Sequence, residues 1–190
     1  VRHAPKRIIF AEGEQPAVVR AANAYHNAGL GQPILIGRAA PIKDAFTQAG
    51  IGFTDAVEMY DTSLADRRQE YAEFLYGRLQ RKGYLLRDCQ RLVTNDRNVF
   101  AACMVAMGHA DGMVTGVTRN FDQVLEEVLN VIDPAPDGRV IGMSVVMAKG
   151  RTLFIADTNV TEMPDADELV EIAIEAARAV RTLGYEPKVA

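Results

Sequence analysis

The sequence predicts an α/β fold whose first part is built on a parallel sheet, and three observations support this prediction. Short apolar runs of strand length alternate with longer segments of helical periodicity. The runs at 7–11 and 33–37 are apolar almost throughout, as in strands that helices cover on both faces. A helix-length segment separates them, which permits the right-handed crossover that joins parallel strands.

The first strand, helix and strand occupy residues 7–37. Pro16 suits the first turn of the intervening helix, where its missing N–H leaves no hydrogen bond unmade. Apolar residues recur through this helix at helical spacing, and Gly29 and Gly31 end it. The strand at 33–37 then completes the unit.

The same alternation continues as far as residue 132. In order, we predict a helix at 38–50, a strand at 56–60, a helix ending near Gly83, helices at 85–93 and 98–108, a strand at 112–116 and a helix at 121–132. Ser63 with Asp66 forms a capping-box-like start for the helix that ends near Gly83. The last helix carries an apolar stripe, formed by Phe121, Val124, Leu125, Val128 and Ile132.

A domain boundary is predicted where this pattern changes. The segment 133–139 is rich in Pro, Asp and Gly, as linkers between domains are. We therefore divide the chain into a first α/β domain, residues 1–135, and the beginning of a second α/β domain, residues 136–190.

The second domain is expected to begin with an antiparallel pair. Strands at 140–148 and 152–158 are joined by a short link that contains glycine, which is typical of a hairpin. A helix follows from Asp165, which has Glu168 three residues later as its capping partner. The final segment, 186–190, resembles a further strand.

Composition and charge exclude several classes of function. The chain has 190 residues and a net charge of −4, which argues against a nucleic-acid partner. No segment is apolar over the length of a membrane span, and the first ten residues lack the apolar core of a signal peptide. Two cysteines without a partner motif favour a reduced, cytoplasmic setting. Three scattered histidines, none with a Cys or second His at ligand spacing, predict no metal site.

The junction between the strand at 112–116 and the helix at 121–132 is the main candidate for ligand binding. In parallel sheets, ligands bind beyond the carboxyl ends of strands, where helix N-termini attract anions. Gly116 allows close backbone approach, Thr115 and Thr118 offer hydroxyls, Asn120 offers an amide and Arg119 offers a forked cation. The alternative is that Asn120 caps the helix and Arg119 is a solvated side chain. The residues alone leave both interpretations open.

Two further junctions have weaker signals. Glu12 and Glu14 follow the first strand and form either an acid–base pair or two acids that complement a helix dipole. Arg97 lies at the start of a helix, where it either attracts an anion or pairs with Asp96. No nucleophile has a base at motif spacing, and the glycine patterns of nucleotide-binding loops are missing, so we predict no catalytic residue.

Several blocks resemble the phosphate acetyltransferase family, in order and over nearly the whole chain. They include "KRIIFAEGE", "GHADGMVTG" and "LFIADTNVTEMPDADELVEIAIEAA". The blocks "VTGVTRNFDQVLEEVLNVIDP" and "RVIGMSVVMAKGRTLFIADTNVTEMP" are more similar to the domain appended to the C-terminus of bacterial multidomain NADP-dependent malic enzymes.

The resemblance implies a fold and a set of partners. Phosphate acetyltransferases have two α/β domains with the coenzyme A cleft between them. The malic enzymes decarboxylate malate oxidatively to pyruvate, and their NADP and Mg or Mn would be held by upstream domains. The appended domain would sense acetyl-CoA or CoA as an effector and help to form a homo-oligomer. The alternatives are an active phosphate acetyltransferase and a purely structural oligomerisation module.

Two departures from the acetyltransferase pattern favour a domain that is not catalytic. Counted from Gly116, a substrate-cleft arginine of the family falls on Glu126, and the proline after it falls on Glu127. A carboxylate at the position of a substrate-binding cation is electrostatically unfavourable. The family's catalytic serine, arginine and aspartate would fall after residue 190, so we expect this chain to hold the first domain and only the start of the second.

Overall fold

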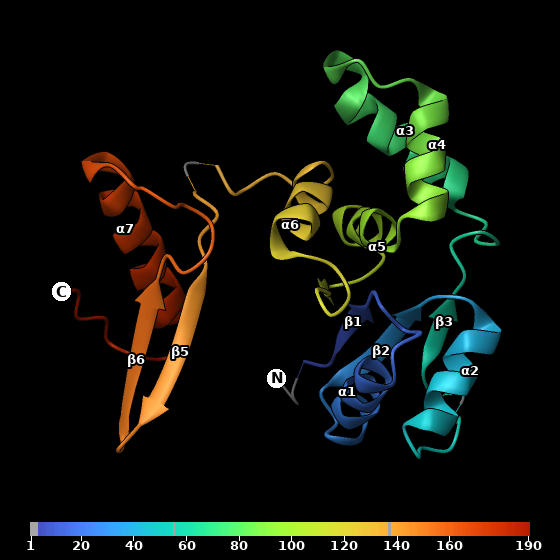
Figure 1. Ribbon diagram of the computed structural model, residues 1–190, viewed down its shortest axis with the longest axis horizontal. Coiled ribbons are helices and arrows are strands. Elements are labelled where there is room, and N and C mark those ends of the chain that lie inside the picture. The colour runs from blue at the N-terminus through green and yellow to red at the C-terminus, as the bar shows by residue number, and fades with distance from the viewer. Residues whose placement is uncertain (1–3, 55, 137) are drawn as a thin grey trace. The chain divides into compact units, whose positions relative to one another are not determined.

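The chain folds into two compact units, Val1–Asp133 and Pro134–Ala190, in the computed structural model (Figure 1). The structure describes residues 4–54, 56–136 and 138–190. His3, one of the three scattered histidines, and Asp137, in the predicted linker, lie outside these ranges. The elements of the first unit are β1 (Lys6–Phe10), α1 (Pro16–Asn27), β2 (Gly31–Ile36), α2 (Ala39–Gln48), β3 (Glu58–Tyr60), α3 (Arg68–Leu79), a 3-10 turn (Gln80–Lys82), α4 (Leu86–Asn95), α5 (Arg97–Ala106), β4 (Gly112–Val114) and α6 (Phe121–Leu129).

The predicted parallel sheet is confirmed. Its strands lie in the order β3-β2-β1-β4, and all three neighbouring pairs are parallel. The register pairs Phe10 with Leu35 on one side and with Val114 on the other, so β1, β2 and β4 end at the same edge. This edge receives the turns that carry the predicted site residues.

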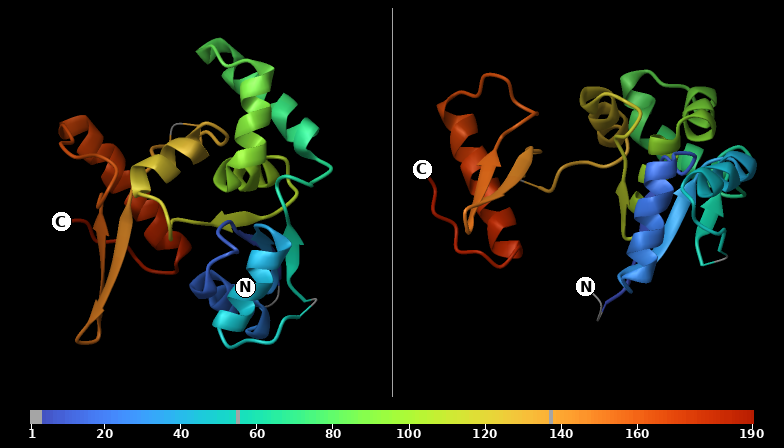
Figure 2. Two further views of the ribbon diagram at one scale, coloured as in Figure 1. Left: turned by 45° about the vertical axis from the view of Figure 1, so that its right-hand side comes forward. Right: turned by 60° about the horizontal axis from the view of Figure 1, so that its bottom comes forward.

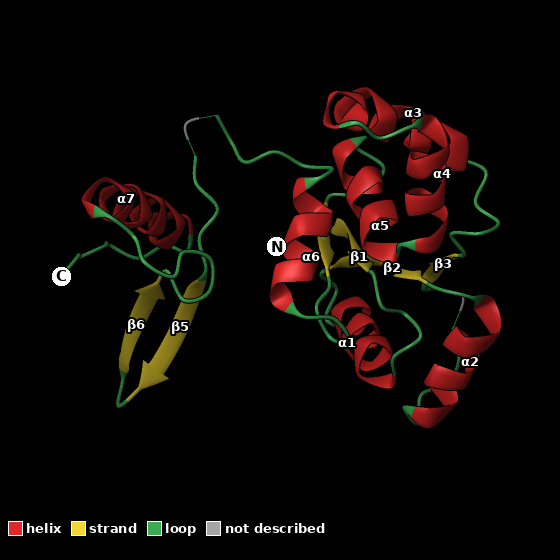
Figure 3. Cartoon of the chain, turned by 45° about the horizontal axis from the view of Figure 1, so that its top comes forward, coloured by secondary structure: helices red, strands yellow, loops and turns green. Residues whose placement is uncertain are grey.

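Helices cover both faces of this sheet, which explains why the central strands are apolar almost throughout (Figure 3). Alternate residues of a strand point to opposite faces. Ile9 and Ala11 therefore pack in the cluster with α3, α4 and α5, whereas Phe10 packs in the cluster with α1 and α2. The result is a three-layer arrangement with two separate cores.

The helix predicted to begin at Ser63 begins later, at Arg68. The Ser63 backbone N–H and hydroxyl both donate to Asp61 Oδ1, at 2.9 and 2.6 Å. Ser63 thus forms a local turn with Asp61, two residues earlier in the sequence. The predicted capping box with Asp66 is wrong. Short-range hydrogen bonding of this kind competes with helix formation.

The apolar stripe on α6 is only partly buried. None of its residues within Phe121–Leu129 is fully buried, and Phe121 is 44% exposed. Val131, which lies outside the predicted stripe, is buried in the core, and Ile132 of the stripe packs against it partly buried. The helix therefore lies at the margin of the core.

The second unit consists of a hairpin and a helix (Figure 2). Strands β5 (Met143–Ala148) and β6 (Arg151–Ala156) pair antiparallel, as predicted, and α7 (Ala166–Thr182) packs against β6. The predicted cap of α7 is confirmed, because Asp165 and Glu168 each accept the other's backbone N–H. Residues 186–190 form no strand in the structure.

Aspartate and arginine side chains organise the loops of this unit. Asp157 accepts backbone hydrogen bonds from Gly142, Asn159, Val160 and Thr161. In the segment before β5, the Arg139 side chain pairs with two carboxylates of α7, at 2.5 and 3.0 Å. These contacts hold the entry of the hairpin against the helix.

Residues 4–54, 56–136 and 138–190 contain neither a membrane-spanning helix nor a cluster of metal ligands. No helix there is both long enough and apolar enough to cross a membrane. No group of three or more His, Cys, Asp or Glu side chains within the same ranges is arranged to hold a metal ion.

Candidate functional site

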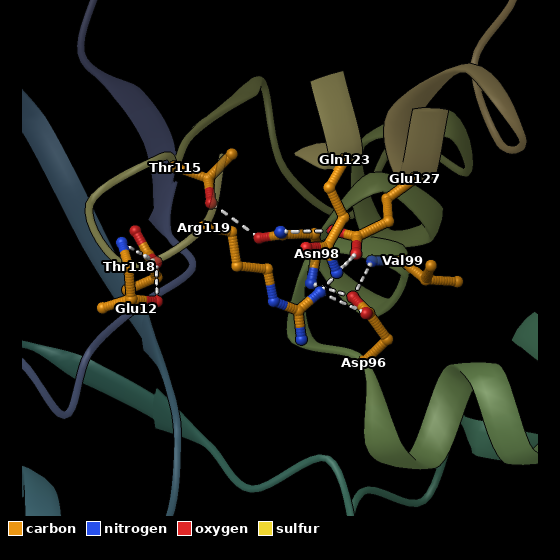
Figure 4. Close-up of polar contacts among 9 residues, drawn as sticks. All are labelled: Glu12, Asp96, Asn98, Val99, Thr115, Thr118, Arg119, Gln123 and Glu127. Carbon is orange, nitrogen blue, oxygen red and sulfur yellow. Dashed lines mark hydrogen bonds and ion pairs between the residues drawn. The ribbon is translucent and has the colours of Figure 1, made fainter. Parts of the chain in front are cut away.

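The predicted site residues lie at the edge of the sheet where β1, β2 and β4 end. Thr115, Gly116, Thr118, Arg119 and Asn120 form the loop from β4 to α6, and Arg97 is the first residue of α5. Figure 4 shows the loop facing the turn after β1 on one side and the start of α5 on the other. The structure thus brings the three predicted junctions to one edge, and the two that follow β1 and β4 lie there as parallel-sheet geometry requires.

The Glu12 carboxylate fills the backbone cradle of this loop. Its Oε2 accepts the N–H groups of Gly116 and Val117 at 3.0 and 2.6 Å, and its Oε1 accepts that of Thr118 at 2.8 Å. The Thr118 hydroxyl donates to Oε1 as well. The loop therefore binds an anionic group, and this group is a side chain of the same chain.

The charge of Glu12 is stabilised even though the side chain is only 2% exposed. Burial is the largest influence and raises its pKa, whereas the hydrogen bonds from the Thr118 hydroxyl and from the three backbone N–H groups lower it. The donors prevail, and the pKa of Glu12 lies below its ordinary value of 4.5. Glu12 is therefore ionised in its buried position at neutral pH.

Arg119 is held between two carboxylates. Its Nη1 contacts Asp96 Oδ2 and Glu127 Oε1, and its side chain is only 22% exposed. The interpretation of Arg119 as a solvated side chain is thus wrong. Its positive charge is compensated within the protein, so Arg119 is not an unpaired cation awaiting an anionic ligand.

A buried amide links these carboxylates to the β4 loop. Asn98, which is 1% exposed, donates from Nδ2 to Glu127 Oε2 at 2.7 Å. Its Oδ1 accepts the Thr115 hydroxyl at 2.6 Å. On α6, Gln123 also donates to Glu127, at 2.9 Å. The network joins α5, α6 and the loop after β4 through residues from all three segments (Figure 4).

The structure decides two of the alternatives that the residues left open. Asn120 is the N-cap residue of α6, but its side chain makes no capping hydrogen bond. Asp96 does not pair with Arg97: it caps α5 by accepting the N–H groups of Asn98 and Val99, and its other oxygen contacts Arg119. Asp96 is fully engaged by these partners.

Glu14 and Arg97 lie on the remaining part of this edge. The Glu14 carboxylate is bound by the side chain and backbone N–H of Arg38, with the closest contacts at 3.0 Å. These hydrogen bonds lower the pKa of Glu14, and the positive charges of Arg38 and Arg97 lower it further. Glu12 and Glu14 thus have separate partners, and they do not form an acid–base pair.

Sequence reasoning missed Glu12, Asp96, Asn98 and Glu127 as members of one site. Glu12 and its cradle are more than one hundred residues apart, and only the β1–β4 pairing brings them together. One signal was present: a glutamate directly after a central buried strand has few ways to remain solvated. Its acceptor role could be expected from that position, but the identity of its donors could not.

A small apolar pocket adjoins Glu12. Its volume is about 140 Å³, and its lining comes from β1, α1 and the β4 loop, including Phe10, Val18, Val114 and Val117. Sites for small organic ligands usually have volumes of roughly 300–1,000 Å³. This pocket is therefore too small for a coenzyme and has room only for a group of a few atoms.

The sequence profile of the family described as "Phosphate acetyl/butaryl transferase" matches residues 1–190. The chain belongs to this family. Among solved structures, the EutD phosphotransacetylase from Staphylococcus aureus is similar with a TM-score of 0.87 and 22% identity, over 96% of this chain and 55% of that one. This likeness supports the α/β fold.

Within the phosphate acetyl/butaryl transferase family, the chain is similar to parts of malic enzymes. It is 51% identical to the NADP-dependent malic enzyme of Rhizobium meliloti, over 100% of this chain and 25% of that protein. It is 42% identical to the probable NADP-dependent malic enzyme of Rickettsia prowazekii, over 97% and 24%. The chain thus spans about a quarter of the length of these curated relatives. Phosphate acetyltransferases match at lower identity.

Proposed function

We propose that this chain is the phosphotransacetylase-like domain of an NADP-dependent malic enzyme, and that it senses acetyl-CoA and supports oligomerisation without catalysing acetyl transfer. The parent enzyme would convert malate to pyruvate through other domains, with NADP and a divalent metal, in the cytoplasm. The similarity to malic enzymes over the whole of this chain is the observation that carries the proposal.

The charges at the carboxyl edge of the sheet support a role other than acetyl transfer. Glu12, Glu14, Asp96 and Glu127 lie there; Glu14 binds the guanidinium group of Arg38, and Asp96 and Glu127 bind that of Arg119. Glu126, at the position of the family's substrate-cleft arginine, is exposed on α6. A carboxylate in place of that arginine disfavours phosphate bound at that position.

Arg97 is the cation we propose for the first contact with an anionic effector. It begins α5, where the helix dipole also favours a negative ligand, and it is not locked between two carboxylates as Arg119 is. Thr115, Gly116, Thr118 and Asn120, in the loop from β4 to α6, form the second part of the proposed effector site.

Calorimetric titration with acetyl-CoA tests this proposal. We expect wild-type protein to bind acetyl-CoA and Arg97→Gln to bind at least about tenfold more weakly, since charge-assisted contacts of this kind contribute roughly 1.5–3 kcal/mol. Arg87→Gln is the matched control, because Arg87 is an exposed arginine whose side chain is 78% accessible on α4. An equal loss in both variants would contradict a specific role for Arg97.

Two other results would replace the proposal with one of the alternatives. Formation of acetyl phosphate from acetyl-CoA and phosphate, with turnover, by the longer protein would identify an active acetyltransferase. The absence of any heat or thermal shift with acetyl-CoA, in a protein that still assembles, would identify a structural oligomerisation module.

A further inference from the structure

We infer that Glu12 is an internal ligand that blocks the anion cradle of residues 116–118 and must leave it before an external anion can bind there. This inference deepens the proposed function, on which it rests for the identity of the physiological effector. It concerns an autoinhibitory contact within the first unit.

All the hydrogen-bond donors of the cradle are occupied by Glu12. Three consecutive backbone N–H groups and one hydroxyl converge on the two oxygens of a single carboxylate, with backbone contacts of 2.6–3.0 Å. Successive N–H groups that point to one place form an anion-binding concavity. Because Glu12 accepts all of them, no donor of this set remains for a phosphate or carboxylate ligand.

Glu12 competes effectively with an external anion for the cradle. It follows β1, which pairs directly with β4, so its carboxylate is always close to the cradle. A tethered ligand acts at a high local concentration that a free ligand must exceed. Expelling Glu12, which is itself 2% exposed, would also place its charge next to the incoming anion.

Release of Glu12 would break the contacts between two segments that are distant in the sequence. The four hydrogen bonds connect the turn after β1 to the loop that leads into α6. An anion in the cradle would keep the loop satisfied but would release the Glu12 side chain from it. Binding would therefore exchange one arrangement of these segments for another, as a ligand-controlled switch requires.

Inorganic phosphate is the probe that tests the inference. We expect Glu12→Ala, in the full 190-residue chain, to bind phosphate at least about tenfold more tightly than wild type, since minor conformations are typically populated at roughly 0.1–10%. The amide resonances of Val117 and Thr118 should shift on titration in Glu12→Ala. Equal affinity in both proteins, or shifts confined to other residues, would overturn the inference.

Two further variants make the experiment specific. Glu12→Gln keeps the side-chain length and serves if Glu12→Ala does not fold; it should bind phosphate more tightly than wild type, and unchanged affinity would count against the inference. Asp122→Asn removes one negative charge in the first turn of α6 without altering the cradle. A gain of affinity in Asp122→Asn equal to that in Glu12→Ala would show a general charge effect and would also overturn it.

Failure of the blocked cradle and failure of acetyl-CoA sensing give different results. Phosphate binding by Glu12→Ala, together with no acetyl-CoA binding by wild type, would support the blocked cradle and reject acetyl-CoA sensing. Acetyl-CoA binding by wild type, without phosphate binding by Glu12→Ala, would support sensing at another place and reject the blocked cradle.

Discussion

At the scale of single residues, the main feature is a glutamate that stabilises the protein only when it is ionised. Glu12 is buried, and each of its oxygens accepts two hydrogen bonds. Arg119 shows the complementary case, in which a partly buried cation is paired with Asp96 and Glu127. In both cases a charged group that looks available in the sequence has an internal partner, because buried charges without partners are strongly unfavourable.

The effect of Glu12 on stability should depend on pH. Its pKa in the folded state lies below 4.5, so its stabilising contribution is complete above that pH and is lost as the pH falls through the folded-state pKa. We expect Glu12→Gln to lower the free energy of unfolding by about 2 kcal/mol at pH 7, as for hydrogen bonds to a charged group. Urea unfolding measures this, and the difference between the two proteins should shrink below pH 4.5. A difference that does not change with pH would contradict the role of the charge.

At the scale of elements, the turn from β1 to α1 is fixed by its close packing on β2. The Gly13 N–H donates to the Ile36 carbonyl at 3.0 Å, which continues the pairing of the two strands beyond their ends. This contact leaves no space for a side chain at Gly13. The turn therefore delivers Glu12 to its cradle from a defined backbone position.

Substitution of Gly13 tests this packing. A Cβ atom at Gly13 would lie 2.8 Å from the Leu35 Cβ and 2.9 Å from the Ile36 carbonyl oxygen. We expect Gly13→Ala to destabilise the protein by about 1–3 kcal/mol, as overpacking does. Gly52→Ala is the matched control, because a Cβ there meets nothing within 4 Å and Gly52 lacks a left-handed φ. Chemical denaturation compares them, and equal midpoints would contradict the close approach.

At the scale of the whole molecule, the two units differ in how much apolar surface they bury. Nearly all fully buried apolar side chains lie in the first unit, whereas Ile172 and Val180 are the two in the described part of the second. Both faces of the hairpin carry exposed apolar residues, with Leu153 and Ile155 on one face and Val145 and Met147 on the other. The second unit, taken by itself, therefore has little hydrophobic stabilisation.

Hydrogen exchange should reveal this difference. Regions with few buried apolar contacts open at a lower free energy than the core of a domain. We expect the amides of β5 and β6 to exchange at least about tenfold faster than those of β1 and β2, a factor that corresponds to roughly 1.4 kcal/mol in opening free energy. Mass spectrometry of peptides after exchange measures both regions in one experiment. Equal protection of the two sheets would show that the hairpin is stabilised by contacts beyond its own unit.

The sequence by itself determined the order of the elements, the parallel sheet and the hairpin. These features follow from local periodicity and from caps such as Asp165 with Glu168, in which the interacting residues are near neighbours. It also marked the loop after β4 as a candidate anion site, with a capped turn as the alternative, because glycine and donor groups precede a helix there. The resemblance to the acetyltransferases rested on the same local blocks of sequence.

Only the tertiary structure decided what occupies the cradle. Glu12 and Thr118 meet because β1 and β4 are neighbours in the sheet, and nothing in either local segment specifies that pairing. The same applies to Arg119, because its partner Asp96 is the N-cap residue of α5 and is distant from it in the sequence. Periodicity reports which face of an element is buried, whereas charge pairing depends on contacts between elements distant in the sequence. The sequence therefore indicates a candidate site for an anion, and the fold shows that the carboxylate of Glu12 is bound there.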